Sequence, residues 1–173
     1  YRGAIPIAEH ALEIARQLDD KGKIVQSLND LGNLYYANQE YPRAKELLVE
    51  TLTYLPDINS QTLERIIFNT LGRVLTANEE YHYASQIFFQ ELDLIKDIHA
   101  DPRTVEILVS VSELLNSMGE KSTALTLVYL LVDYPLISAE ANARAGRLLD
   151  DLTVEKIQPE NRDWSLDQTS QII

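Results

Sequence analysis

The sequence predicts an all-α fold, a solenoid of antiparallel helix pairs packed one after another. Three observations lead to this expectation. Small side chains recur at an interval of 40 residues, large apolar side chains between them follow helical spacing, and the 173 residues include only six glycines and six prolines. Few residues therefore interrupt helices, and the fixed interval indicates one supersecondary unit used several times.

Two series of residues share the 40-residue interval. The first series is Ala4, Ala44, Ala84 and Ala124. Three residues before each alanine stand Tyr1, Tyr41, Tyr81 and Lys121, in that order. The second series is Leu31-Gly32, Leu71-Gly72 and Val111-Ser112. A small side chain at each position allows a neighbouring helix to approach closely, so each series is expected to lie in a contact between helices.

The spacing of apolar residues predicts eight helices. They span residues 2–18, 23–38, 41–54, 60–78, 81–98, 102–118, 121–133 and 138–152. We expect their core from residues three or four positions apart: Leu28, Leu31, Tyr35, Ala44, Leu47, Leu48, Leu52, Phe68, Leu71, Leu75, Ala84, Ile87, Phe88, Leu92, Leu108, Val111, Leu115, Ala124, Leu127, Val128 and Leu131.

Polar turns separate the helices of each predicted pair. Pro42 suits the first turn of a helix, where no backbone N–H is needed, and Asp101-Pro102 is interpreted as an N-cap followed by proline. Gly119 is predicted to end a helix in the left-handed conformation.

Composition restricts the classes of function. The chain has 27 acidic and 15 basic residues and a net charge of −12, which disfavours binding to nucleic acid or to an anionic membrane surface. Cysteine is absent, which excludes disulfides and thiolate chemistry and suits a reducing cytoplasm. Neither a membrane span nor a signal-peptide pattern occurs, so a cytoplasmic location is expected.

One pair carries the pattern of a known family. Its residues Leu28, Leu31, Gly32, Tyr35, Ala44, Leu48 and Pro56 resemble the tetratricopeptide signature, with Leu28 where the signature has tryptophan. The interval of 40 exceeds the usual period of about 34, but the 13 residues from Leu31 to Ala44 are the spacing expected within a pair. The long period is similar to that of kinesin light chains and of bacterial signalling proteins.

This resemblance implies a right-handed superhelix over residues 1–152. Its first repeat would lack the first helix, which fits a fragment of a larger protein, and its last helix would be a cap. Residues 153–173, with Trp164, would form a tail, in part disordered. The bare face of the first helix makes a homodimer an alternative way to cover it.

A solenoid of this kind exposes a concave groove lined by the first helix of each pair. The residues predicted to line it are Asn29, Asn33, Tyr36, Asn69, Arg73, Thr76, Glu106, Ser110, Glu113, Asn116, Arg144 and Arg147. Amides offer donors and acceptors to a peptide backbone, and arginine offers a fork to carboxylates. A solvated helix face would have a similar composition.

The predicted function is a protein-interaction scaffold that binds a protein or peptide in this groove. An alternative is a sensor array that controls an attached output domain, and a less favoured one is an enzyme with an unrecognised site. No catalytic motif, cofactor loop or metal-ligand spacing occurs, and His10, His82 and His99 fall on different repeats. We therefore expect no cofactor and no metal.

Overall fold

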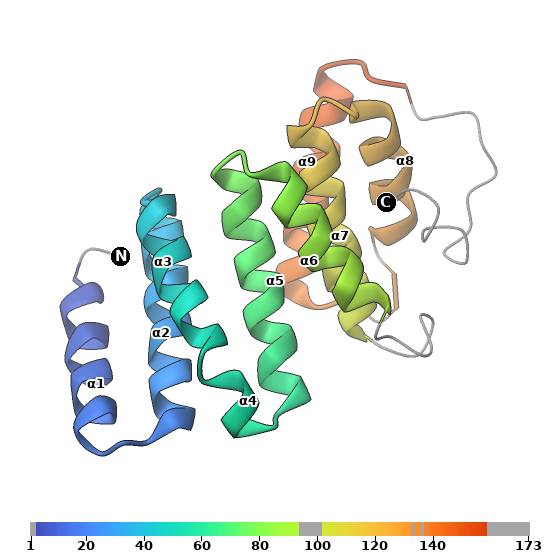
Figure 1. Ribbon diagram of the computed structural model, residues 1–173. Helices are drawn as coiled ribbons and strands as arrows, with labels where there is room; N and C mark the ends of the chain where they lie inside the picture. Colours follow the sequence, from blue (N-terminus) through green and yellow to red (C-terminus); the bar gives the residue numbers. More distant parts are fainter. Residues whose placement is uncertain (1–2, 94–101, 133, 136, 159–173) are drawn as a thin grey trace. The chain divides into compact units, whose positions relative to one another are not determined.

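The computed structural model describes residues 3–93, 102–132, 134–135 and 137–158. Helices occupy most of these residues, and no strand occurs among them, which confirms the all-α class (Figure 1). The chain divides into two compact units, Tyr1–Glu80 and Tyr81–Ile173. Each unit is described by itself.

The first unit is a series of antiparallel helices in which α2 packs against both α1 and α3 (Figure 1). Its helices are α1 (Ile5–Gln17), α2 (Lys21–Ala37), α3 (Tyr41–Leu52), α4 (Leu55–Ile58) and α5 (Gln61–Ala77). Helix α5 contacts both α3 and α2. The helices thus follow one another as stacked hairpins, as the repeat pattern predicts.

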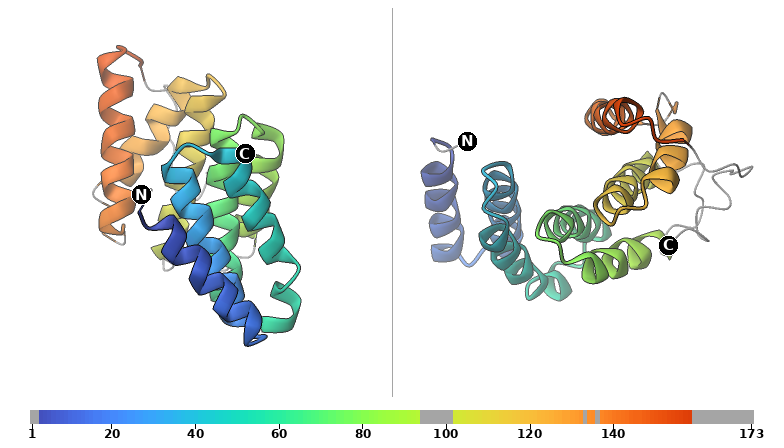
Figure 2. Two further views of the ribbon diagram at one scale, coloured as in Figure 1. Left: turned by 90° about the vertical axis from the view of Figure 1, so that its left-hand side faces the viewer. Right: turned by 90° about the horizontal axis from the view of Figure 1, so that it is seen from above.

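The second unit contains α6 (Tyr81–Asp93), α7 (Pro102–Ser117), α8 (Lys121–Leu131) and α9 (Ala139–Val154). Helix α7 packs against α6, α8 and α9, and α8 also contacts α9 (Figure 2). Helix α9 extends two residues beyond the predicted 138–152, to Val154. Residues 2, 94–98 and 133 of the predicted helices lie outside the described residues. So do Asp101 and the tail residues 159–173, which include Trp164.

The alanine series lies in the core. Ala44, Ala84 and Ala124 each have 0% of their surface exposed. A Cβ added at Gly32 would lie 2.9 Å from Cγ of Leu48, which is itself fully buried. The small side chains therefore stand where neighbouring helices approach, as predicted, whereas Ala4 precedes α1 and is exposed.

The predicted apolar core is largely confirmed. Leu28, Leu31 and Leu48 in the first unit and Leu108, Leu127 and Leu131 in the second are buried to 1% exposure or less. Tyr35, Leu52, Phe68, Ile87 and Leu92 are only half-buried.

The helix ends share one conformation at the 40-residue interval. Gln39, Glu79 and Gly119 all have positive φ, at 64°, 62° and 89°. The following amide in each case donates to the carbonyl five positions back in the helix, as Glu120 N does to Leu115 O at 2.9 Å. The prediction for Gly119 is confirmed, and the same left-handed turn occurs at two residues that carry side chains.

The helix predicted over residues 41–54 ends two residues earlier than expected. Helix α3 ends at Leu52, and the short helix α4 follows with Pro56 in its first turn. Pro56 has no backbone N–H to donate to the carbonyl of Leu52 four residues before it, which accounts for the end of α3 at Leu52. Asn59 then ends α4 in the left-handed conformation, and Ser60 caps α5 by accepting from the Leu63 amide.

Candidate partner-binding site

The predicted groove residues of the first unit lie on two helices in contact. Helix α2 carries Asn29, Asn33 and Tyr36, and α5 carries Asn69, Arg73 and Thr76. Each set has a spacing of four and then three residues, which places its members on one face of their helix. We call the surface formed by these six residues the α2–α5 face.

An aromatic and cationic cluster joins the two helices of this face. The guanidinium carbon of Arg73 lies 5.2 Å from the centroid of the Tyr36 ring, within the range of a cation–π interaction. The Tyr36 ring also contacts the ring of Tyr41: the two ring centroids lie 5.7 Å apart, at an interplanar angle of 50°. Tyr36 and Arg73 are both half-buried, so part of each side chain reaches the surface.

The other members of the face differ in exposure. Asn33 and Asn69 are half-buried, and Nδ2 of Asn33 donates to the backbone oxygen of Asn29 at 3.1 Å. Asn29 is 8% exposed, and its buried Oδ1 accepts no hydrogen bond within the part of the chain that the structure describes. Thr76 is buried and donates from Oγ1 to the Gly72 carbonyl at 2.9 Å. The accessible part of the face is thus formed by Asn33, Tyr36, Asn69 and Arg73.

The predicted groove residues of the second unit include an internal ion pair. Arg144 on α9 is buried; its Nε donates to Oε1 of Glu113 on α7 at 2.9 Å, and its Nη2 donates to Oγ of Ser110 at 2.8 Å. The fork that we expected arginine to offer to a ligand is directed here at a carboxylate of the same chain. Glu106 and Asn116 are half-buried, and Arg147 is exposed.

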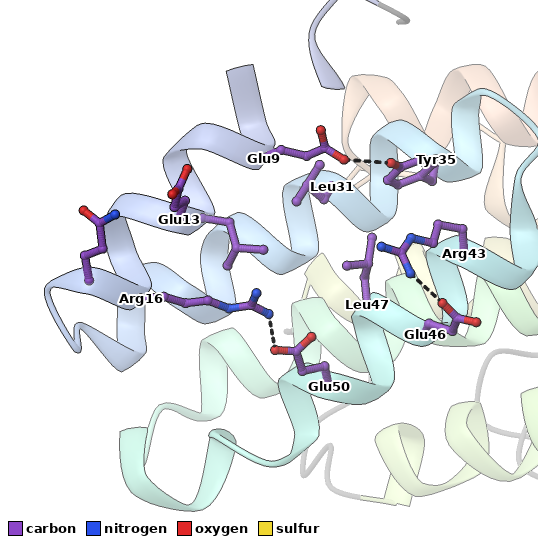
Figure 3. Close-up of a pocket in the computed structure, with 11 residues that line it drawn as sticks. Glu9, Glu13, Arg16, Leu31, Tyr35, Arg43, Glu46, Leu47 and Glu50 are labelled. Carbon is purple, nitrogen blue, oxygen red and sulfur yellow. Dashed lines mark hydrogen bonds and ion pairs between the residues drawn. The ribbon is translucent and has the colours of Figure 1, made fainter. Parts of the chain in front are cut away.

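The sequence did not predict a cavity of about 800 Å³ in the first unit (Figure 3). Helices α1 and α3 form its walls, and Leu31 and Tyr35 of α2 contribute to its floor. Its lining consists of Glu9, Leu12, Glu13, Arg16, Gln17, Leu31, Tyr35, Arg43, Glu46, Leu47 and Glu50. The only signal in the sequence was the placement of glutamates beside buried leucines in two helices 40 residues apart, which is also typical of any solvated helix.

Two of the three histidines are described. His10 lies 3.6 Å from the Glu13 carboxylate, and the ring of His82 lies 5.7 Å from that of Tyr83. His99 lies outside the described residues. Within the described ranges, histidine, aspartate and glutamate side chains form no group of three suited to a metal ion.

Comparison with known families identifies the hairpin formed by α2 and α3. Residues 24–54 match the model of the tetratricopeptide repeat. The chain contains a tetratricopeptide repeat. The matched residues include Leu28, Leu31, Gly32, Ala44 and Leu48, on which the resemblance was based. A search of curated proteins finds no match.

The match confirms the tetratricopeptide signature in one pair. The likeness of the 40-residue period to kinesin light chains stays a prediction, as does a groove that continues through all the predicted pairs. Among the described helices, none has the length and apolar character needed to cross a bilayer.

Proposed function

We propose that this tetratricopeptide chain is a protein-interaction scaffold whose α2–α5 face binds a peptide segment bearing a carboxylate. Tetratricopeptide repeats serve in protein–protein interaction, which supports the general class of function. The stacking of Arg73 on Tyr36 is the observation that supports this face as the site.

The chemistry of the cluster suits recognition. Tyrosine and arginine are the residue types over-represented where binding energy concentrates in interfaces. A guanidinium held against an aromatic ring loses less conformational entropy on binding than a free one, and its fork matches the two oxygens of a carboxylate. Tyr36 is itself held by Tyr41, so the cluster is ordered before a ligand arrives.

Amide side chains flank this cluster along both helices. Asn33 lies about one turn before Tyr36 on α2, and Asn69 lies one turn before Arg73 on α5. An amide side chain pairs with both the N–H and the C=O of an extended peptide backbone. A ligand would therefore place its carboxylate at Arg73 and its backbone along Asn33 and Asn69.

A displayed peptide library selected on the whole chain tests the proposal. Selected peptides are expected to share an aspartate, a glutamate or a free C-terminus, and Arg73→Ala is expected to weaken their binding at least about tenfold, as loss of an interface hot spot does. Asn33→Ala should weaken binding less. Lys23→Ala, which removes an exposed positive charge from the same helix α2, is the matched control and should leave the affinity unchanged.

Circular dichroism of each variant establishes that its fold is retained. Equal binding by the original chain, Arg73→Ala and Asn33→Ala would show that the α2–α5 face is not the site. Arg73→Lys separates charge from geometry, because lysine keeps the charge and loses both the fork and the planar stacking.

A further inference from the structure

We propose that the cavity between α1 and α3 is a second binding site, which takes a basic peptide segment through one lysine or arginine and an adjacent apolar residue. This proposal does not depend on the function proposed for the α2–α5 face. Leu31 and Tyr35, which contribute to the cavity floor, lie on a different side of α2 from Asn33, because residues two apart on a helix are rotated by about 200°.

The cavity has fixed walls. Arg16 on α1 forms an ion pair with Glu50 on α3, which joins the two walls, and the Tyr35 hydroxyl on α2 donates to Glu9 on α1 at 3.1 Å (Figure 3). These bonds connect all three helices around the opening. The space between α1 and α3 is therefore held open by defined contacts rather than left by loose packing.

The floor of the cavity is apolar. Leu12, Leu31 and Leu47 are all at least nine-tenths buried, and the half-buried ring of Tyr35 lies beside them. A volume of about 800 Å³ lies in the range of sites that enclose a ligand. Such a floor suits an apolar side chain or the aliphatic stem of lysine or arginine, whose charged end stays near the rim.

The rim of the cavity carries excess negative charge. Four glutamates and two arginines line it, and the arginines are matched by Glu50 and Glu46. The remaining carboxylates are those of Glu9 and Glu13, one turn apart on α1. Glu9 accepts a hydrogen bond from a neutral hydroxyl, and Glu13 is 66% exposed beside His10.

This imbalance indicates the charge of the ligand. A cationic side chain entering between the walls meets two carboxylates that no lysine or arginine neutralises in the described part of the chain. An anionic segment would be repelled by the same two carboxylates at the rim of this cavity. The partner that fits is therefore a basic segment with apolar neighbours.

The test is the binding of a fluorescein-labelled peptide, Leu-Lys-Leu-Arg, blocked at both ends, to the whole chain. Fluorescence anisotropy at low salt should detect binding, and the peptide Leu-Glu-Leu-Glu should not bind. The double variant Glu9→Gln and Glu13→Gln should weaken binding of the basic peptide about three- to tenfold, since exposed ion pairs contribute modestly. Both glutamines keep the shape of the replaced side chains, so the fold is expected to persist.

The matched control is Asp150→Asn and Asp151→Asn on α9, which changes the net charge by the same amount in the second unit. It should alter the affinity less than twofold, and Arg73→Ala on the α2–α5 face should not weaken it. Equal weakening by the control variant would attribute binding to the overall charge and overturn the proposal. Three other results would also overturn the proposal: no binding of the basic peptide, equal binding of the acidic peptide, or loss of binding in Arg73→Ala.

Discussion

The buried guanidinium of Arg144 on α9 donates through both Nε and Nη2 to the carboxylate of Glu113 on α7. The same Nη2 also donates to Oγ of Ser110, one turn before Glu113. A charge buried at this position is stable only while its partners remain. The pair therefore fixes α9 against α7 and has a structural role in the second unit.

Removing one partner of this pair should destabilise the fold. Glu113→Ala leaves the Arg144 charge buried without the Glu113 carboxylate. We expect the free energy of unfolding to fall by about 2–3 kcal/mol. This loss is smaller than that for a fully buried pair because the Glu113 side chain is 31% exposed. Urea unfolding followed by circular dichroism measures this loss. The double variant Arg144→Met and Glu113→Leu should lose much less, because no charge then stays buried; an equal loss would refute this explanation.

The left-handed helix ends predict opposite effects at matched positions. Gly119→Ala places a Cβ on a residue with φ of 89° and should lower stability by about 1 kcal/mol. Gln39→Gly, at φ of 64° in the equivalent turn, should raise stability by several tenths of a kcal/mol or more. Thermal unfolding of the two variants measures both shifts, and a change of the same sign in both would contradict this reading of the turns.

The close approach at Gly32 predicts a second pair of opposite effects. Gly32→Ala gains helix propensity but brings Cβ to 2.9 Å from Cγ of the fully buried Leu48, so we expect a net loss of about 1 kcal/mol. Gly146→Ala on α9 meets no described atom within 4 Å and should gain up to about 1 kcal/mol from propensity alone. Urea midpoints compare the two; a Gly32→Ala variant as stabilised as Gly146→Ala would show that the contact is unimportant.

The ion pair between Lys45 and Glu80 predicts a pH dependence. Its hydrogen bond from Lys45, and next that from Asn78, hold the pKa of the Glu80 carboxyl below its ordinary value. The stability that Glu80 contributes is therefore present above the unfolded-state pKa of about 4.3 and is lost as the pH falls through the folded-state pKa.

The variant Glu80→Gln measures this contribution. At neutral pH it should be less stable than the original chain by less than about 1 kcal/mol, because the pair is partly exposed. Urea unfolding at several pH values should show this difference shrinking as the pH falls below the unfolded-state pKa of about 4.3 and through the lower folded-state pKa. A difference that grows as the pH falls would have the wrong sign for a carboxylate with a lowered pKa.

Periodic small residues carried most of the information about the fold. Ala44, Ala84 and Ala124 were predicted to lie in helix contacts because only a small side chain fits there, and all three are fully buried. Gly119 indicated its turn for a different reason, because glycine accepts a positive φ without cost. Gln39 and Glu79 adopt that conformation without any such signal, because the helix-end hydrogen bonds of the turn impose it.

The site was less accessible to prediction because the function of a polar side chain depends on its neighbours. Helical spacing predicts that Tyr36 and Asn33 share one face of α2, but the stacking of Arg73 on Tyr36 depends on how α5 packs. Arg144 is buried against a carboxylate of its own chain, Glu113, and the sequence pattern gives no sign of that pairing. The cavity between α1 and α3 requires three helices to be placed before it exists.

Hydrogen exchange of the whole chain, with and without a peptide selected on it, tests the central claim most directly. Binding at the α2–α5 face should slow amide exchange in the segments 29–36 and 69–76, and Arg73→Ala should abolish this protection at the same peptide concentration. Protection confined to other segments, or protection of these segments that persists unchanged in Arg73→Ala, would contradict the account.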